Sequence, residues 1–168
     1  MSLYMPLGNV IIPQAIAEVS STQKTPLGRI IQAEDRASTA YGVGEFIYVK
    51  GVASGTANSW AAYYPDDWTT VLTVATTKGD IGIMMAALVA NTYGWLQISG
   101  KGVGKVLAAF ADNGDVYLTS TAGSVDDAVV DGYLVHQCRG ASAIDTPTTG
   151  LAEMELARPY TDGIATND

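Results

Sequence analysis

The sequence has little of what catalytic and metal-binding proteins usually carry. Its 168 residues include one cysteine and one histidine. A single cysteine excludes an intrachain disulfide and a zinc site built from several thiolates, and Cys138, inside the apolar run 134–139, is predicted to be a small core residue. Any Ser–His catalytic pair would depend on His136, and no serine lies in a G-x-S-x-G motif. The sequence therefore predicts no catalytic residues, and we interpret the protein as a non-enzyme.

Charge is also scarce. The chain has 9 Lys or Arg against 17 Asp or Glu, so its formal net charge is -8, and charged residues make up only 15% of the sequence. Nucleic-acid binding requires basic side chains that neutralise phosphates, so direct contact with nucleic acid is not expected. A charged fraction below the usual level of about 25% has two explanations. Either a partner covers part of the surface, or the abundant Ser and Thr residues solvate it.

Long apolar runs are absent as well. No stretch approaches the 18 or more apolar residues that a membrane-spanning helix needs. The start of the chain, MSLYMPLGNVIIPQ, has neither the basic region nor the apolar region of a secretory signal. We therefore expect no membrane partner and a soluble protein made in a reducing cytoplasm.

Two motifs match ligand sites only in part. Asp112-Asn113-Gly114-Asp115 begins like a calcium loop, but the twelfth position is Gly123 where that loop needs a Glu. A hairpin turn of Asn-Gly type explains these residues better. The glycine-rich run 100–104 precedes an apparent strand, whereas a phosphate site needs a helix N-terminus. No metal and no cofactor are predicted.

What the sequence does contain is a series of short β-branched and aromatic runs separated by Gly, Asn-Gly and Asp-Gly. This pattern is typical of an all-β protein, either a single β-sandwich or a β-barrel-like body. The sharpest alternation places Ala152, Met154 and Leu156 on one face and two glutamates on the other. Further strands are expected at 45–52, 71–74, 81–90, 95–99, 103–107, 116–120 and 132–138, with turns at 100–102 and 113–115.

The first 43 residues differ from the rest because Pro6, Pro13 and Pro26 interrupt short apolar pieces. Proline removes a backbone donor, so this segment is not expected to form a central strand. It is interpreted as an extended N-terminal arm, with a peripheral strand and loops of the same domain as the alternative. The expected organisation is an arm at 1–43, a β-rich body at 44–160 and a flexible tail at 161–168.

Four segments resemble the structural proteins of tailed-bacteriophage heads: GEFIYVKGVAS (44–54), YGWLQISGKGV (93–103), FADNGDVYLTSTAGSVDDAVVDG (110–132) and RGASAIDTPTTGLAEMELARPY (139–160). The resemblance is to the small capsid decoration, or cement, proteins. It implies a β-rich homotrimer on the outer surface of the virion, which binds the major capsid protein and stabilises the shell against internal pressure.

Contact residues are predicted from composition in the arm and in the aromatic piece 60–68. They are Val10, Ile11, Ile12, Ile16, Trp60, Tyr63, Tyr64 and Trp68. If the arm carries these contacts, deleting residues 1–40 would abolish capsid binding and leave the body folded. The alternative function is another virion component, a head-fibre base or tail-tip protein, which binds carbohydrate through the aromatic piece.

Overall fold

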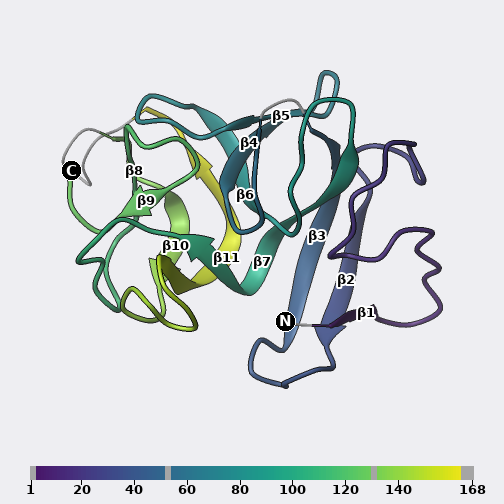
Figure 1. The fold of residues 1–168 in the computed structure, drawn as a ribbon, viewed down its shortest axis with the longest axis horizontal. Coiled ribbons are helices and arrows are strands. Elements are labelled where there is room, and N and C mark those ends of the chain that lie inside the picture. Colours follow the sequence, from purple (N-terminus) through teal and green to yellow (C-terminus); the bar gives the residue numbers. More distant parts are fainter. Residues whose placement is uncertain (1–2, 52–53, 130–131, 164–168) are drawn as a thin grey trace.

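The computed structural model describes residues 3–51, 54–129 and 132–163, and these residues form an all-β protein (Figure 1). The all-β prediction is confirmed: the described residues contain no helix, and hence none long and apolar enough to cross a membrane. Nine strands form one mixed sheet and two short strands form a separate hairpin. The strands are β1 (Tyr4–Pro6), β2 (Ile30–Asp35), β3 (Val43–Lys50), β4 (Trp60–Tyr64), β5 (Thr69–Leu72), β6 (Gly79–Met84), β7 (Tyr93–Lys105), β8 (Tyr117–Leu118), β9 (Val125–Asp126), β10 (His136–Gly140) and β11 (Leu151–Thr161).

Five strands of the large sheet close into a ring. β3 pairs with β7 along six residues and with β5 at Lys50↔Thr69. β5 continues through β4 and β6 back to β7. β1 and β2 extend the sheet beyond β3, whereas β11 and β10 extend it beyond β7. The molecule is therefore a central ring with a different extension at each end, as Figure 1 shows.

Alternation along the ring strands divides the buried side chains among three cores. Ile47 and Val49 of β3 point into the ring, where they join Leu96 and Ile98. Phe46 and Tyr48 of the same strand point outward, into a core beneath the N-terminal segment. At the other end, a third core collects side chains from β4, β6, β8 and β11, among them Trp60, Ile81, Leu118 and Met154. Strands covered on both faces read as continuous apolar runs, which explains the pattern of 45–52.

The longest strand, β7, joins the two ends because it pairs with β3 and β6 in its first half and with β11 in its second half. The turn predicted at 100–102 is wrong, since these residues lie inside β7. Gly100 has φ +91°, and a Cβ there would lie 2.4 Å from the Val43 carbonyl oxygen. Glycine is required because the backbone of β3 passes too close for any side chain.

The N-terminal segment is not an extended arm. β1 pairs with β2 and β2 pairs with β3, and residues between β1 and β2 pack on the body. Gln14 is 4% exposed, and its side-chain amide donates hydrogen bonds to the carbonyls of Glu18 and Tyr93 at 2.8 and 2.9 Å. The hydroxyl of Tyr48 donates to Gln14 Oε1 at 2.6 Å. The segment therefore belongs to the folded body, which is the alternative interpretation of its sequence.

Other boundaries also differ from the sequence predictions. β6 ends at Met84, so the run expected as a strand at 81–90 continues as bends and turns. The strand expected at 132–138 begins later, at His136. Thr161, the first residue of the predicted tail, is the last residue of β11 and is buried, while residues 164–168 lie outside the described part of the chain.

Candidate functional site

The single histidine lies beside a carboxylate. His136 begins β10, and its Nε2 lies 3.1 Å from Asp162 Oδ1. Its ring stacks on Tyr160 with a centroid distance of 4.9 Å. Cys138, two residues further along β10, packs against the core that contains Trp60, and burial raises the pKa of its thiol. The sequence interpretation of a small core residue agrees with this place, and the neutral thiol is a poor nucleophile.

The Asp112–Asp115 motif and the carboxylates of Asp126 and Asp127 lie close to β8 and β9. Asn113 has φ +61°, as a turn residue would, and Asp127 Oδ2 accepts a hydrogen bond from the Ala111 amide at 2.8 Å. Burial raises the pKa of Asp126; the Asp127 carboxylate adds to this shift, whereas the hydrogen bond that the Asp127 amide donates to Asp126 Oδ1 opposes it. Within the described ranges no three His, Cys, Asp or Glu side chains are grouped closely enough to hold a metal ion.

The predicted aromatic contacts are largely inside the protein. Trp60 is 0% exposed and Tyr63 is 7% exposed, so neither can touch a partner without unfolding. Trp68 is half-buried, stacks on Tyr63 with a centroid distance of 6.5 Å, and covers the backbone of Gly28. Tyr64 is exposed. A row of aromatic faces open to a sugar is therefore not present among these residues.

The predicted contacts in the N-terminal segment separate into two groups. Ile16 is buried and Ile12 is half-buried against the same core, so both hold the segment on the body. Val10 is exposed, and Ile11 is 83% exposed, the highest value among the described large apolar side chains. Sequence reasoning did not foresee Gln14, whose backbone carbonyl accepts a hydrogen bond from Trp95 Nε1 at 3.3 Å.

Most of the exposed large apolar side chains lie in the N-terminal part of the chain. Of the 12 large apolar side chains that are exposed among the described residues, 7 lie between Leu3 and Val43. Four of them form what we call the outer strand face, the side of β1, β2 and β3 opposite the core that contains Phe46 and Tyr48: Leu3, just before β1, and Met5, Ile30 and Val43. Met5 pairs with Glu34 and Glu34 with Val43, so these side chains share one face of the sheet.

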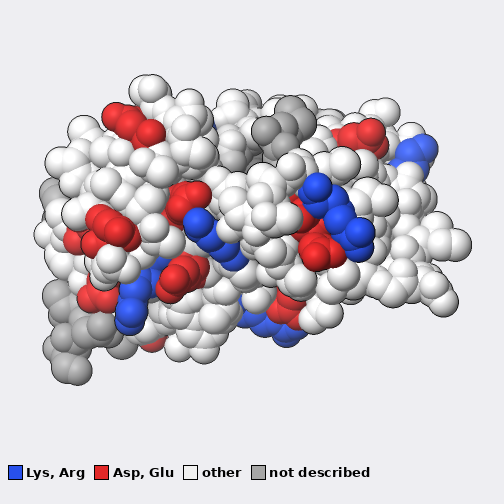
Figure 2. Space-filling model, turned by 90° about the horizontal axis from the view of Figure 1, so that it is seen from below, with Lys and Arg blue, Asp and Glu red and all other residues white. Residues whose placement is uncertain are grey.

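Acidic residues, in contrast, are concentrated in the C-terminal part of the chain. Residues 106–168 contain ten acidic and two basic residues, a net charge of -8, whereas residues 1–43 contain three of each kind and residues 44–105 four of each kind. All of the net charge therefore belongs to the last third of the sequence. Figure 2 shows more acidic than basic side chains toward the left end of the molecule, and acidic and basic side chains together near its middle and right. The protein has a neutral, apolar end and an acidic end.

Between the two ends lies a groove of about 500 Å³. Its lining contains no charged residue and includes Tyr4, Tyr41, Met85, Gln97, Val103 and Leu151. Burial raises the pKa of Tyr4 to about 12, helped by the charge of Asp35, and burial together with Glu153 raises the pKa of Tyr41 to about 12. Both phenols are therefore neutral at ordinary pH, and the groove presents apolar surface with neutral hydrogen-bonding groups.

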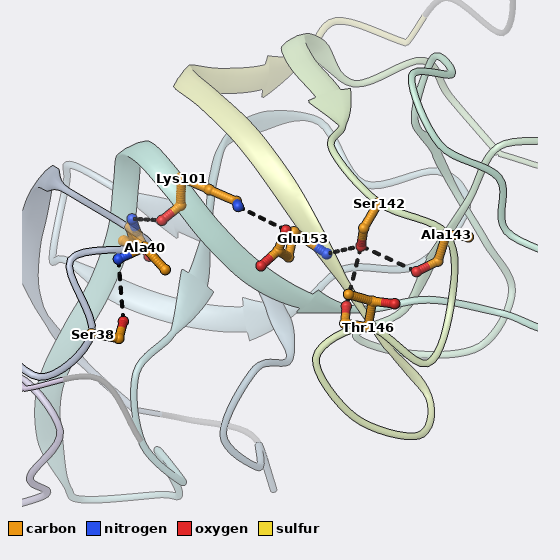
Figure 3. Close-up of polar contacts among 8 residues, drawn as sticks. Ser38, Ala40, Lys101, Ser142, Ala143, Thr146 and Glu153 are labelled. Atoms are coloured by element: carbon orange, nitrogen blue, oxygen red, sulfur yellow. Dashed lines mark hydrogen bonds and ion pairs between the residues drawn. The ribbon is translucent and has the colours of Figure 1, made fainter.

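A polar network fixes the strands and the loop beside the groove (Figure 3). Lys101 Nζ lies 2.8 Å from Glu153 Oε2, across β7 and β11. The Glu153 amide donates to Ser142 Oγ at 2.9 Å, and this hydroxyl lies 3.2 Å from the Thr146 carbonyl. Gln97 Nε2 donates to the Lys101 carbonyl at 3.1 Å. Because these groups satisfy one another, the groove is a preformed feature of the fold.

Comparison with known proteins does not assign a family. No family model matches the chain, and a search of curated proteins finds no significant similarity. The function must therefore be argued from the surface and its chemistry.

Proposed function

We propose that this protein is a structural component of a tailed-phage virion, which binds the outer surface of the capsid as an oligomer and stabilises the shell. The observation that carries the proposal is the division between a neutral, apolar end and an acidic end. The barrel-like body would act as a rigid spacer between them. The resemblance of residues 44–160 to capsid decoration proteins points to the same function.

The neutral end suits a protein surface as its partner. Exposed apolar side chains gathered on one face mark sites of protein–protein contact, and completing the burial of one half-exposed side chain contributes less than the about 1.5–3 kcal/mol of full burial, before the entropic cost of association is subtracted. The major capsid protein is the proposed partner of the outer strand face, with Val10, Ile11 and Tyr64 available as further capsid or subunit contacts. The acidic end would then face the solvent, away from the shell and its DNA, where like charge opposes non-specific association.

Several weak contacts would act together. In a homotrimer, three copies of the outer strand face engage the shell at once, and the linked contacts raise the overall affinity well above that of one copy. The alternative, a head-fibre base or tail-tip protein that binds carbohydrate through residues 60–68, has less support because Trp60 and Tyr63 are buried and Trp68 is half-buried.

The test is co-sedimentation with empty shells assembled from the major capsid protein of the same phage. Met5→Asp and Val43→Asp place carboxylates on the outer strand face, and each is expected to weaken binding by about tenfold or more, equivalent to about 1.4 kcal/mol. Val71→Asp is the matched control, because Val71 is an exposed strand valine on β5. Equal sedimentation of all three variants, or none of the wild-type protein, would overturn the proposal.

A further inference from the structure

The turn at Asn113 and Gly114 brings together two groups that can react with each other. Asparagine is a chemically labile residue, because the backbone nitrogen of the residue that follows can attack its side-chain amide. A glycine in that position leaves the nitrogen open, since it has no side chain to hinder the attack. The turn lies on the surface before β8, where Asp112, Asn113 and Asp115 are all exposed.

Three asparagines of the described chain share the same left-handed backbone conformation. Their φ angles are +69° at Asn58, +62° at Asn91 and +61° at Asn113. Asn58 is half-buried, and its Nδ2 donates a hydrogen bond to the Val103 carbonyl at 2.9 Å. Asn91 and Asn113 are both exposed. Exposure and backbone conformation therefore do not separate Asn91 from Asn113, and the difference must come from the residue that follows each of them.

The amide that would attack is held by a hydrogen bond after the first two asparagines. The Ser59 N–H donates to the Thr56 carbonyl at 3.1 Å, and the Thr92 N–H donates to the Val89 carbonyl at 3.2 Å. Among the described residues none accepts a hydrogen bond from the Gly114 N–H. Gly114 therefore combines an unhindered nitrogen with an N–H that no other described group holds in place.

The fold also allows the movement that the attack requires. Rotation about the Asn113 Cα–C bond brings the Gly114 nitrogen toward Asn113 Cγ, and a compensating change at Gly114 is one that glycine tolerates. The Gly114 carbonyl accepts a hydrogen bond from the Gly140 amide at 3.1 Å. This carbonyl belongs to the next peptide group, so the rotation does not require that bond to break. Because the turn is exposed, the movement uncovers no core side chain.

We propose that Asn113 is a site of spontaneous deamidation in the folded protein. The Gly114 nitrogen forms a bond to Asn113 Cγ, the bond from Cγ to the side-chain nitrogen breaks, and that nitrogen leaves as ammonia with the proton that Gly114 gives up. The product is a succinimide ring. Water then adds to one of the two ring carbonyls and breaks its bond to the ring nitrogen, which yields either aspartate or isoaspartate. Water is the only co-reactant, and nothing is oxidised or reduced.

The modification changes both the charge and the path of the chain. Either product places a carboxylate where the sequence has a neutral amide, beside Asp112 and Asp115 in the segment that already carries all of the net charge. Isoaspartate also routes the main chain through the side-chain carbon, next to the contact between Gly114 and Gly140. The reaction needs only the turn and water, so the inference goes beyond the capsid proposal and does not depend on it.

The test compares two asparagines within one sample. The folded protein is incubated in mildly alkaline buffer, digested with trypsin and analysed by mass spectrometry. Cleavage after Lys and Arg places Asn113 in the peptide 106–139 and Asn91 in the peptide 79–101, with no second asparagine in either. Fragment spectra locate the change, and isoaspartyl methyltransferase labels isoaspartate. Asn113 is expected to react at least about tenfold faster than Asn91.

A variant tests the part played by the glycine. A Cβ at Gly114 would lie 3.4 Å from Asp127 Cβ, which is an ordinary contact, so Gly114→Ala should fold like the wild type and show the same circular dichroism spectrum. Its added methyl group hinders the attacking nitrogen and should slow the reaction at Asn113 by about tenfold or more. Gly42→Ala is the matched control: it changes a glycine outside this turn and should leave the rate unchanged.

Three results would overturn the inference. The first is an equal rate at Asn113 and Asn91 in the folded protein. The second is a Gly114→Ala variant that reacts at Asn113 as fast as the wild type. The third is a folded wild-type protein that keeps its Asn113 amide while the same protein, unfolded in guanidinium chloride, loses it, because the fold would then protect the turn.

Discussion

The two ends of this molecule are built from the same kind of strands but differ in what they show to solvent. At the β1–β2 end, apolar side chains remain exposed and acidic and basic residues are equal in number. In residues 106–168 of the sequence, the stretch that contains β8 to β11, acidic residues exceed basic ones by eight. Both ends cover a well-filled core, so the difference does not arise from packing. It lies in the surface, and a surface difference of this kind indicates different surroundings for the two ends.

The largest effect on stability is expected from deleting most of the neutral end. Deleting residues 1–40 should prevent folding, since it uncovers Phe46, Tyr48 and Trp95, each 0% exposed. Losing the cover of three large aromatic side chains costs several kcal/mol, comparable with the total stability of a domain. Circular dichroism and thermal unfolding provide the measurement.

Ile11→Ser is the control for this deletion, because it alters the same segment without touching the core and should melt like the wild type. A deleted protein that still unfolds cooperatively near the wild-type temperature would show that the neutral end is an independent arm after all.

A smaller loss of stability is expected from a substitution at Gly100, where β7 passes close to β3. Gly100→Ala places a Cβ 2.4 Å from the Val43 carbonyl oxygen at a residue with φ +91°, and should lower the free energy of unfolding by about 3 kcal/mol. Gly42→Ala is the matched control: its φ is +59° and nothing lies within 4 Å, so only the left-handed backbone costs energy, about 1 kcal/mol. Urea unfolding measures both. Equal losses would mean that β7 can move away from β3 at this point.

The buried phenol of Tyr4 predicts that the free energy of unfolding falls at alkaline pH. Burial raises the pKa of Tyr4, at the neutral end, to about 12, whereas an unfolded tyrosine titrates near 10. The folded state therefore keeps its proton where the unfolded state has lost it. The stabilisation is complete below pH 10 and falls between about pH 10 and 12, at most by about 3 kcal/mol.

Tyr4→Phe should reduce this loss of stability between pH 10 and 12, measured by urea unfolding at each pH. Tyr64→Phe is the control, since Tyr64 is exposed. If both substitutions left the same alkaline slope as the wild type, Tyr4 would titrate normally and its burial would have no energetic consequence.

The smallest effect on stability is expected for the exposed ion pair between Arg158 and Glu45. Arg158 makes two hydrogen bonds of 3.1 Å to the Glu45 carboxylate and so links β11 to β3, but its side chain is 56% exposed. Solvent screens such a pair, so Arg158→Ala should change stability by less than about 1 kcal/mol. The effect should fall further at high salt. A loss of several kcal/mol that is insensitive to salt would assign this pair a central part in holding the ends together.

Strands with a regular alternation could be predicted from the sequence. Ala152, Met154 and Leu156 all reach the core as expected, and the run 45–52 corresponds to β3. Gly100 and Gly102 suggested a turn because glycine is common in turns, but here glycine allows two backbones to approach. Only the path of β3 reveals that requirement, and this path is not visible in a local pattern.

The candidate contacts were harder to predict. Aromatic residues occur both in cores and in interfaces, so the sequence could not separate the buried Trp60 from the exposed Tyr64. The N-terminal segment looked detachable because prolines interrupt it. Its attachment depends on Gln14, which binds the backbone of Tyr93, 79 residues away in the chain. Long-range pairing of this kind leaves no periodic signal.

The position of β7 at the centre of the fold also determines when the protein can acquire its structure during synthesis. β1, β2 and β3 leave the ribosome first. β7, which pairs with β3, follows about 50 residues after β3, and β11 joins the sheet only near the end of the chain. Folding that depends on such distant contacts is slow, because the entropic cost of closing long loops comes before the contacts that offset it can form. Until β7 arrives, the open edge of β3 can pair with other chains. The nascent protein therefore passes through a period in which aggregation competes with folding, and expression at low temperature or low rate should increase the yield of folded protein.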